Sequence, residues 1–345
     1  MAKLSDGIRG ACGSKLKDFL HALSINRFAG FLTGVFACML TNSLSCIAVI
    51  LVSFVSADLI EMERCFGILL GACVGSTFIS YLVVFKVVDY GLFLIFWGYC
   101  ITFFGHAIKT KQIGDAVFGL GLLFYSMEIM GNAFSFVKTH EGFLRLLSRM
   151  SNPWLGMLVS TLFTGLIQSS GATMSILLQL ARQGMLKMDA CTGLMLGANV
   201  GTCVTGLLAA IGKSRDALRL AVALFLFRLV SALFMLPFVH PFSRLVCYTC
   251  SISPHSSAPG DVTIFLASSH TIFNLVLSVF VLPFTDQWAL LIRWLIPDNF
   301  RDVDGLTTVK LGKASNKKNL HVKRSKSLPT APRPVASSPQ TPPDV

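Results

Sequence analysis

Two clusters of amide and hydroxyl side chains interrupt apolar stretches of this chain. Asn42-Ser43-Leu44-Ser45 lies in the first stretch and Gln168-Ser169-Ser170 in the second. Each cluster is followed 29 residues later by a glycine motif, at Gly71 and at Gly197, and the two copies are offset by 126 residues. Polar groups at membrane depth in paired copies are typical of transporters built from internal repeats. The chemistry that we expect from them is the binding of a solute.

Covalent chemistry is not indicated by the sequence. No nucleophile, base and orienting residue stand at recognisable spacings, and no metal-ligand cluster is visible. We therefore predict that the protein is not an enzyme and has no cofactor.

The composition indicates a membrane protein. Hydrophobic residues make up 53% of the 345 residues and charged residues 13%, with a mean hydropathy of +0.68. This leaves too little polar surface for a soluble globule, and strand-type alternation is absent. We predict an all-α polytopic membrane protein with apolar segments at about 30–57, 66–85, 91–108, 113–137, 155–181, 190–211, 217–239 and 262–284.

The polar clusters stand in the middle of their segments. Within Gly30 to Val55, Asn42 has 12 residues before it and 13 after it, and Gln168 is placed similarly in 155–181. If each cluster breaks its helix, each half is on the order of 18 Å long, against a hydrocarbon core of about 30 Å. Such halves suit a re-entrant hairpin. The predicted fold therefore has two internal repeats, each with a re-entrant or broken helical hairpin that carries the polar motif.

The orientation of the repeats depends on these breaks. Two simple crossings give eight spans and parallel repeats, whereas two hairpins give six spans and inverted repeats, the arrangement that we favour. Lys and Arg counts in the loops barely separate the schemes, at 7 inside and 6 outside for parallel repeats against 6 and 7 for inverted ones. Both schemes predict a multi-pass protein of the cell (inner) membrane with cytoplasmic N- and C-termini.

Charge and composition divide the chain into four parts. We predict a basic cytoplasmic segment at 1–28, membrane repeat 1 at 29–152, membrane repeat 2 at 153–296 and a disordered polybasic tail at 297–345. From Gly305 onward the tail holds +7 of the net charge of +12. We interpret the tail as cytoplasmic sequence that contacts anionic lipid, and not as a nucleic-acid site.

Two cysteines lie in a stretch that we predict to be an outside loop, residues 240–261. Cys247 and Cys250 are close enough in sequence for a disulfide, and free thiols are the alternative. Metal binding is disfavoured because no second pair has this spacing.

Several motifs recur in one order along the chain. A glutamine followed by serines lies within Gly165 to Thr173, and a glycine motif lies within Leu196 to Thr202. Ser269 to Leu275 precedes Pro283-Phe284, and Leu70 to Thr77 repeats the glycine motif in the first half. This order resembles the membrane domain of the type II sodium/phosphate cotransporter family over roughly residues 30–284. The phosphate-regulator-like domain that follows it in many bacterial members has no counterpart in this sequence.

The chain departs from the family pattern in both copies. Asn42 and Leu44 stand where the family has glutamine and serine, and Gly171 replaces the last serine of the second copy. Leu224 and Arg228 lie in a helix where members often carry His and Asn.

The resemblance implies inorganic phosphate as substrate and sodium as coupling ion. Phosphate needs convergent donors and positive potential, which hydroxyls and half-helix N-termini supply, and sodium needs hard oxygen ligands. The predicted phosphate-binding residues are Asn42, Ser43, Ser45, Gln168, Ser169, Ser170 and Arg228. The predicted sodium-binding residues are Ser76, Thr77, Thr173, Asn199 and Thr202. The alternative for each hydroxyl is a hydrogen bond to its own helix.

Other polar residues have expected structural roles. The side-chain amides of Asn42 and Gln168 are expected to brace the opposite hairpin. Arg228 lies in the middle of an apolar segment, and we predict Glu128 as its partner, with a structural ion pair and a direct anion contact as alternatives. His270 is expected to be packed and hydrogen-bonded, and Asn274 to join helices.

The function predicted from these residues is a secondary active symporter that imports phosphate with sodium by alternating access. The alternatives are a carrier of another small oxyanion, a proton-coupled carrier, and a membrane scaffold or regulator that does not transport.

Overall fold

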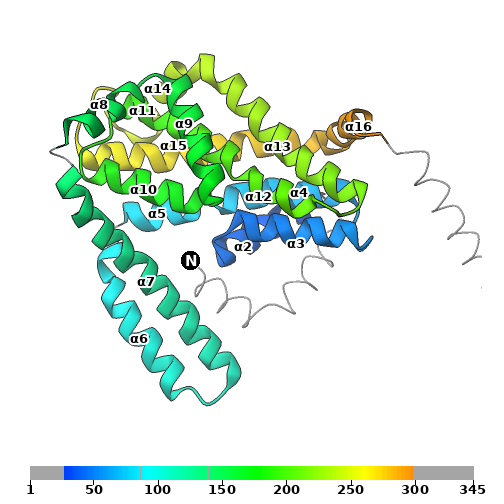
Figure 1. The fold of residues 1–345 in the computed structure, drawn as a ribbon, viewed down its shortest axis with the longest axis horizontal. Helices are drawn as coiled ribbons and strands as arrows, with labels where there is room; N and C mark the ends of the chain where they lie inside the picture. Colours follow the sequence, from blue (N-terminus) through cyan, green and yellow to red (C-terminus); the bar gives the residue numbers. More distant parts are fainter. Residues whose placement is uncertain (1–26, 86, 138–139, 298–345) are drawn as a thin grey trace, which may run out of the picture. The chain divides into compact units, whose positions relative to one another are not determined.

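The structure, a computed structural model, describes residues 27–85, 87–137 and 140–297. All regular structure in these ranges is helical (Figure 1). The α-helices are α2 (Arg27–Thr41), α3 (Leu44–Ser56), α4 (Met62–Gly75), α5 (Phe78–Val84), α6 (Gly91–Phe104), α7 (Ile108–Val137), α8 (Glu141–Arg149), α9 (Pro153–Ile167), α10 (Ser170–Arg182), α11 (Met188–Gly201), α12 (Cys203–Ala210), α13 (Arg215–Met235), α14 (Val239–Cys250), α15 (Pro259–Val281) and α16 (Thr285–Leu295). The basic N-terminal segment up to residue 26 and the tail from residue 298 lie outside the described residues.

Both polar clusters break their helices, which confirms the prediction. Asn42 follows α2 with a φ of 49°, and Gln168 follows α9 with a φ of 59°, so both adopt the left-handed conformation that ends helices. The helices on either side of each break have 15 and 13 residues. At 1.5 Å per residue each is about 20 Å long, shorter than a hydrocarbon core of about 30 Å.

Glycines spaced four residues apart let helix backbones touch. A Cβ placed on Gly71 would lie 1.8 Å from the Phe31 carbonyl oxygen, and one on Gly197 would lie 2.2 Å from the Met157 carbonyl oxygen. These contacts pair Arg27, Phe31 and Val35 of α2 with Gly67, Gly71 and Gly75 of α4, and Pro153, Met157 and Thr161 of α9 with Gly193, Gly197 and Gly201 of α11. The small-residue spacing is the one used by closely packed membrane helices.

The order of these contacts fixes the course of the chain. Residue numbers rise together in each pair, so α2 runs parallel to α4 and α9 runs parallel to α11. The connecting helices α3 and α10 must therefore turn back. We call α2–α3 the first hairpin and α9–α10 the second hairpin.

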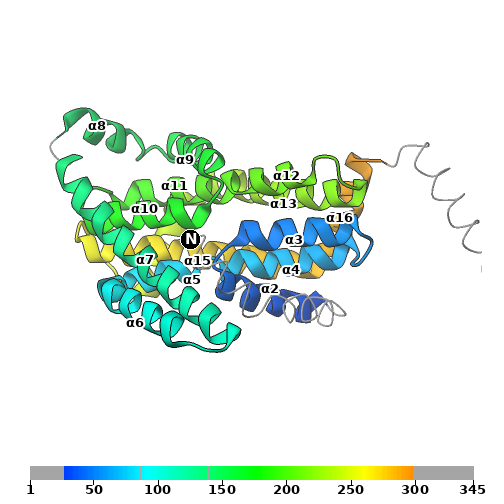
Figure 2. The ribbon, with the colours of Figure 1, turned by 60° about the horizontal axis from the view of Figure 1, so that its bottom comes forward.

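Each hairpin packs on helices from the other half of the chain. α3 contacts α12 and α13, and α10 contacts α5 and α7 (Figure 2). Ala48 of α3 lies beside Gly206 of α12, and the Ser214 N–H donates to Ser56 Oγ at 3.2 Å, so α3 and α12 run in the same direction. Because α12 continues α11, which is parallel to α9, the two hairpins point in opposite directions.

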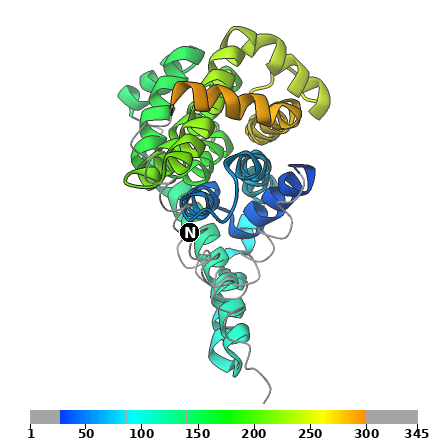
Figure 3. The same ribbon diagram turned by 90° about the vertical axis from the view of Figure 1, so that its right-hand side faces the viewer.

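Four helical stretches in the described ranges are long and apolar enough to cross a membrane. They are Met62–Val84, Met188–Ala210, Arg215–Cys250 and Pro259–Leu295. α6 and α7 pack on each other and extend away from the other helices as a pair (Figures 1 and 3). Large apolar side chains on α6 are exposed, among them Phe93, Trp97 and Phe103, as expected of a lipid-facing surface.

Three amphipathic helices, α8, α14 and α16, were not predicted. α14 and α16 each follow a Leu-Pro-Phe turn, Leu236–Phe238 and Leu282–Phe284. The prediction of a loop over 240–261 is therefore wrong up to Cys250, because the proline turn redirects the helix without ending it. Cys247 and Cys250 are free thiols, and Cys247 is buried with its Sγ 3.6 Å from the Met188 Sδ.

Ion pairs connect α16 to the starts of two other helices. Arg27 pairs with Asp286 at 2.7 Å, and Arg293 pairs with Glu63 at 2.9 Å. α16 therefore joins the base of the first hairpin to the base of α4.

Candidate functional site

The breaks place two helix N-termini at the tips of the hairpins. Ser43 Oγ accepts from the Cys46 N–H at 3.2 Å, and Ser169 Oγ accepts from the Ala172 N–H at 3.2 Å. Each serine therefore caps a helix through its oxygen, and its hydroxyl hydrogen can still be donated. The first two N–H groups of each helix have no acceptor among the described residues; they belong to Leu44, Ser45, Ser170 and Gly171. Helix N-termini of this kind favour anions.

The two tips meet at one carbonyl group. Ser45 Oγ donates to the Gln168 main-chain oxygen at 3.2 Å, and Thr205 Oγ1 donates to the same oxygen at 3.3 Å. The left-handed conformation turns this carbonyl out of its helix, so it is free to accept from other helices. The bracing contact is therefore made by the backbone of Gln168, whereas we predicted its side-chain amide. That side chain is exposed.

A hydroxyl pair joins the two helices of the second hairpin. Thr164 Oγ1 donates to Thr173 Oγ1 at 3.0 Å, and Thr173 Oγ1 is 3.3 Å from the Ser169 carbonyl oxygen. Both threonines are buried. Thr164 and Thr205 were missed by the sequence analysis, although Thr164 precedes Gln168 by four residues and therefore lies on the same face of its helix.

The predicted sodium ligands lie in three different settings. Ser76, Thr77 and Thr202 stand where α4 meets α5 and where α11 meets α12, and each hydroxyl donates to a carbonyl of its own helix at 2.8 Å. Thr173 belongs to the second hairpin. Asn199 lies on α11 with its side-chain oxygen directed at Arg228. Among the described residues no hydrogen bond joins two of these five side chains, and their role in sodium binding stays a prediction.

Arg228 is held by amides. Its Nη1 donates to Asn199 Oδ1 at 2.7 Å and also to Asn274 Oδ1. Only 2% of Arg228 is exposed, whereas Glu128 is exposed. The predicted pair with Glu128 is wrong, because Arg228 is buried and is hydrogen-bonded to amides of α11 and α15 instead. His270 Nε2 lies 3.3 Å from the same Asn199 oxygen.

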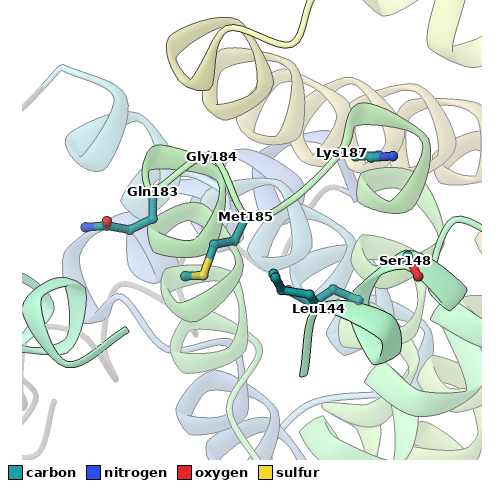
Figure 4. A pocket seen from close by; sticks show the side chains of 7 residues that line it. Leu144, Ser148, Gln183, Gly184, Met185 and Lys187 are labelled. Atoms are coloured by element: carbon teal, nitrogen blue, oxygen red, sulfur yellow. The ribbon is translucent and has the colours of Figure 1, made fainter. Parts of the chain in front are cut away.

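One surface pocket lies away from these groups. Figure 4 shows it between α8 and the turn after α10. Its lining residues are Leu144, Leu147, Ser148, Gln183, Gly184, Met185 and Lys187, which include none of the predicted site residues.

Comparison with known proteins assigns the family. The chain matches the Na+/Pi-cotransporter family over residues 1–132 and 137–245. The chain belongs to this family. It is therefore a multi-pass membrane protein of a transporter family and not an enzyme.

Relatives of this family member differ in length and in name. It is 27% identical over 298 residues to "Uncharacterized protein YqeW" of Bacillus subtilis, covering 86% of this chain and 94% of the relative. It is 26% identical to "Putative inorganic phosphate export protein YjbB" of Salmonella typhimurium, covering 85% of this chain and 52% of the relative, so it spans about half of that protein. A shorter stretch of 111 residues, 31% of this chain and 16% of the relative, is 33% identical to human "Sodium-dependent phosphate transport protein 2B". No solved structure matches the chain.

Proposed function

We propose that this protein is a secondary active carrier that imports inorganic phosphate together with sodium. The observation that carries the proposal is the meeting of the two hairpin tips at the Gln168 carbonyl, with open helix N-termini on both sides. The family and the names of two groups of relatives support phosphate as the substrate.

The tips match the chemistry of phosphate. Near neutral pH phosphate carries between one and two negative charges and many acceptor oxygens. The hydroxyls of Ser43 and Ser169 and the N–H groups that follow them supply donors, and the two helix dipoles supply positive potential. Gln168, whose exposed side chain lies at the same turn, completes the set that we assign to the substrate, with Asn42, Ser45 and Ser170.

Sodium is assigned to the hydroxyl and carbonyl oxygens near the tips. Thr173 lies closest in sequence to the second tip, and its hydroxyl already joins two helices. Ser76, Thr77 and Thr202 offer hydroxyl oxygens at the junctions of α4 with α5 and α11 with α12. A bound cation would offset the charge of phosphate, so each ion favours binding of the other.

We infer that the chain consists of two inverted repeats with cytoplasmic termini. The equal offset of the breaks and of the glycine contacts supports this, as does the opposite direction of the hairpins. Alternating access would then expose the paired tips to one side of the membrane at a time.

The direction of transport has a specific alternative. Relatives with 26% identity carry names of putative phosphate export proteins, which favours export as the second candidate. A proton in place of sodium and a non-transporting scaffold are further alternatives.

Phosphate flux in proteoliposomes tests the proposal. We expect labelled phosphate to accumulate when external sodium exceeds internal sodium, and Ser169→Ala to reduce the rate by about 10²-fold or more because a donor and a helix cap are lost. Ser53→Ala is the matched control, because Ser53 is exposed at the far end of α3 and its hydroxyl bonds its own helix.

The outcomes separate the alternatives. Movement of phosphate in the direction opposite to that of sodium supports export. Phosphate accumulation driven by a pH gradient without sodium identifies protons as the coupling ion. Absence of phosphate flux in folded protein under every gradient overturns the proposal and favours the scaffold.

A further inference from the structure

Arg228 is the centre of a buried polar group formed by three helices. It lies on α13, and its two amide partners, Asn199 and Asn274, lie on α11 and α15. No carboxylate forms an ion pair with it among the described residues. A full positive charge is therefore held inside a membrane helix bundle by two amide oxygens, without a carboxylate partner among the described residues.

The orientation of the two amides is fixed by their own helices. Asn199 Nδ2 donates to the Met195 carbonyl at 3.2 Å, and Asn274 Nδ2 donates to the His270 carbonyl at 2.7 Å. Because each NH₂ group is used in this way, both side-chain oxygens must point at the guanidinium. The two helices thus present a pair of amide oxygens to a cation.

Amide oxygens are also what a sodium ion requires. Sodium sites in membrane carriers are built from side-chain and backbone oxygens with no obligatory carboxylate. A guanidinium bound to two such oxygens carries the same single charge in the same kind of site, but it cannot leave. Nε and Nη2 of Arg228 are buried without a hydrogen-bond partner among the described residues. This is expected if the two oxygens suit a compact ion better than a guanidinium, which has five N–H donors to satisfy.

The position of Arg228 relates it to the hairpin tips. Asn199 lies on the same continuous stretch as Thr205, which donates to the Gln168 carbonyl. Their separation of six positions corresponds to about 9 Å along a helix. A charge at this distance in a poorly solvated site stabilises an anion at the tips.

We propose that the guanidinium of Arg228 permanently occupies one of the cation positions of the carrier. This protein would then move phosphate with one sodium ion fewer than a carrier in which that position is open to sodium. The inference rests on the proposed function, and it reassigns Arg228 and Asn199 from direct ligands of mobile solutes to a fixed charge and its cradle.

Two measurements on the full-length protein test this assignment. The first is thermal unfolding of purified protein in sodium and in choline. We expect Arg228→Gln and Arg228→Ser to unfold at a higher temperature in sodium than in choline, because the vacated oxygens bind the ion. Wild type and Arg228→Lys, which keep the charge, should show a smaller sodium effect.

The second measurement is phosphate flux against sodium concentration in proteoliposomes. We expect Arg228→Gln to lose flux by about tenfold or more at low sodium and to regain it at high sodium, with a steeper sodium dependence than wild type. Arg228→Lys, which keeps the charge, should keep the wild-type steepness of the sodium dependence whatever its maximal rate.

Each other result overturns the assignment. If Arg228→Gln and Arg228→Ser unfold at the same temperature in sodium and in choline, the site does not bind a cation. Failure of both variants to fold in either salt leads to the same conclusion. A raised half-saturation for phosphate at every sodium concentration, with unchanged sodium dependence, makes Arg228 a direct phosphate ligand. Failure of wild-type protein to move phosphate overturns the proposed function alone, since the unfolding measurement does not depend on transport.

Discussion

At the second break the chain turns over a pair of buried hydroxyls, Thr164 and Thr173, whereas the residues 126 positions earlier are the buried Cys38 and Ile47. The backbones of the two breaks are alike, with left-handed residues at Asn42 and Gln168. The first hairpin therefore keeps the turn and the serine cap but lacks the hydroxyl pair at these two positions. The second hairpin keeps both the turn and a polar interior.

The difference separates structural requirements from chemical ones. Asparagine adopts left-handed backbone more readily than glutamine does. The conformation of the turn is therefore enough to explain an asparagine at position 42. Gln168 occupies the same conformation at a cost of roughly 1–2 kcal/mol, which is typical of a residue retained for function. We infer that the second hairpin contributes most of the polar chemistry and the first hairpin mainly a helix N-terminus.

The largest expected effect is loss of folding when the glycine contacts that both hairpins share are blocked. Gly71→Ala and Gly197→Ala should both prevent folding, because the added Cβ would lie 1.8 Å and 2.2 Å from backbone oxygens that cannot move independently. The yield of monodisperse protein in detergent measures this. Gly260→Ala is the control, since nothing lies within 4 Å of its Cβ position. Folding of one glycine variant but not the other would show that the hairpins do not share this contact.

The shared features could be read from the sequence, and the contacts between halves could not. Asn42 and Gln168 stand out because amides are rare in apolar stretches, and their equal spacing from Gly71 and Gly197 predicts a repeated structure. The partner of Arg228 was mispredicted because charge alone suggests a carboxylate, whereas the choice of partner depends on which helices pack around it. α14 was missed because its polar residues resemble a loop until one face is packed on α11 and α15.

A smaller effect should distinguish the two interiors. Thr173→Val should lower the free energy of unfolding by about 1–3 kcal/mol, because the buried Thr164 hydroxyl loses its partner. Ile47→Val in the first hairpin removes a methylene and should cost about 0.5–1.5 kcal/mol. Thermal unfolding in detergent gives the order of the two variants, and sodium-dependent flux should fall only for Thr173→Val. Equal loss of flux in both variants would remove the proposed chemical difference.

The smallest effect on stability should accompany the clearest effect on function. Gln168→Gly keeps the left-handed turn and the carbonyl that accepts from Ser45 and Thr205, so stability should stay within about 1 kcal/mol of wild type or rise. Phosphate flux should nevertheless fall, because the exposed carboxamide is lost. Asn42→Gly, which removes the corresponding carboxamide from the first hairpin, should lower flux by a smaller factor. If Gln168→Gly transports as well as wild type, the side chain of Gln168 has no role, and its contribution lies in the backbone carbonyl that joins the two tips.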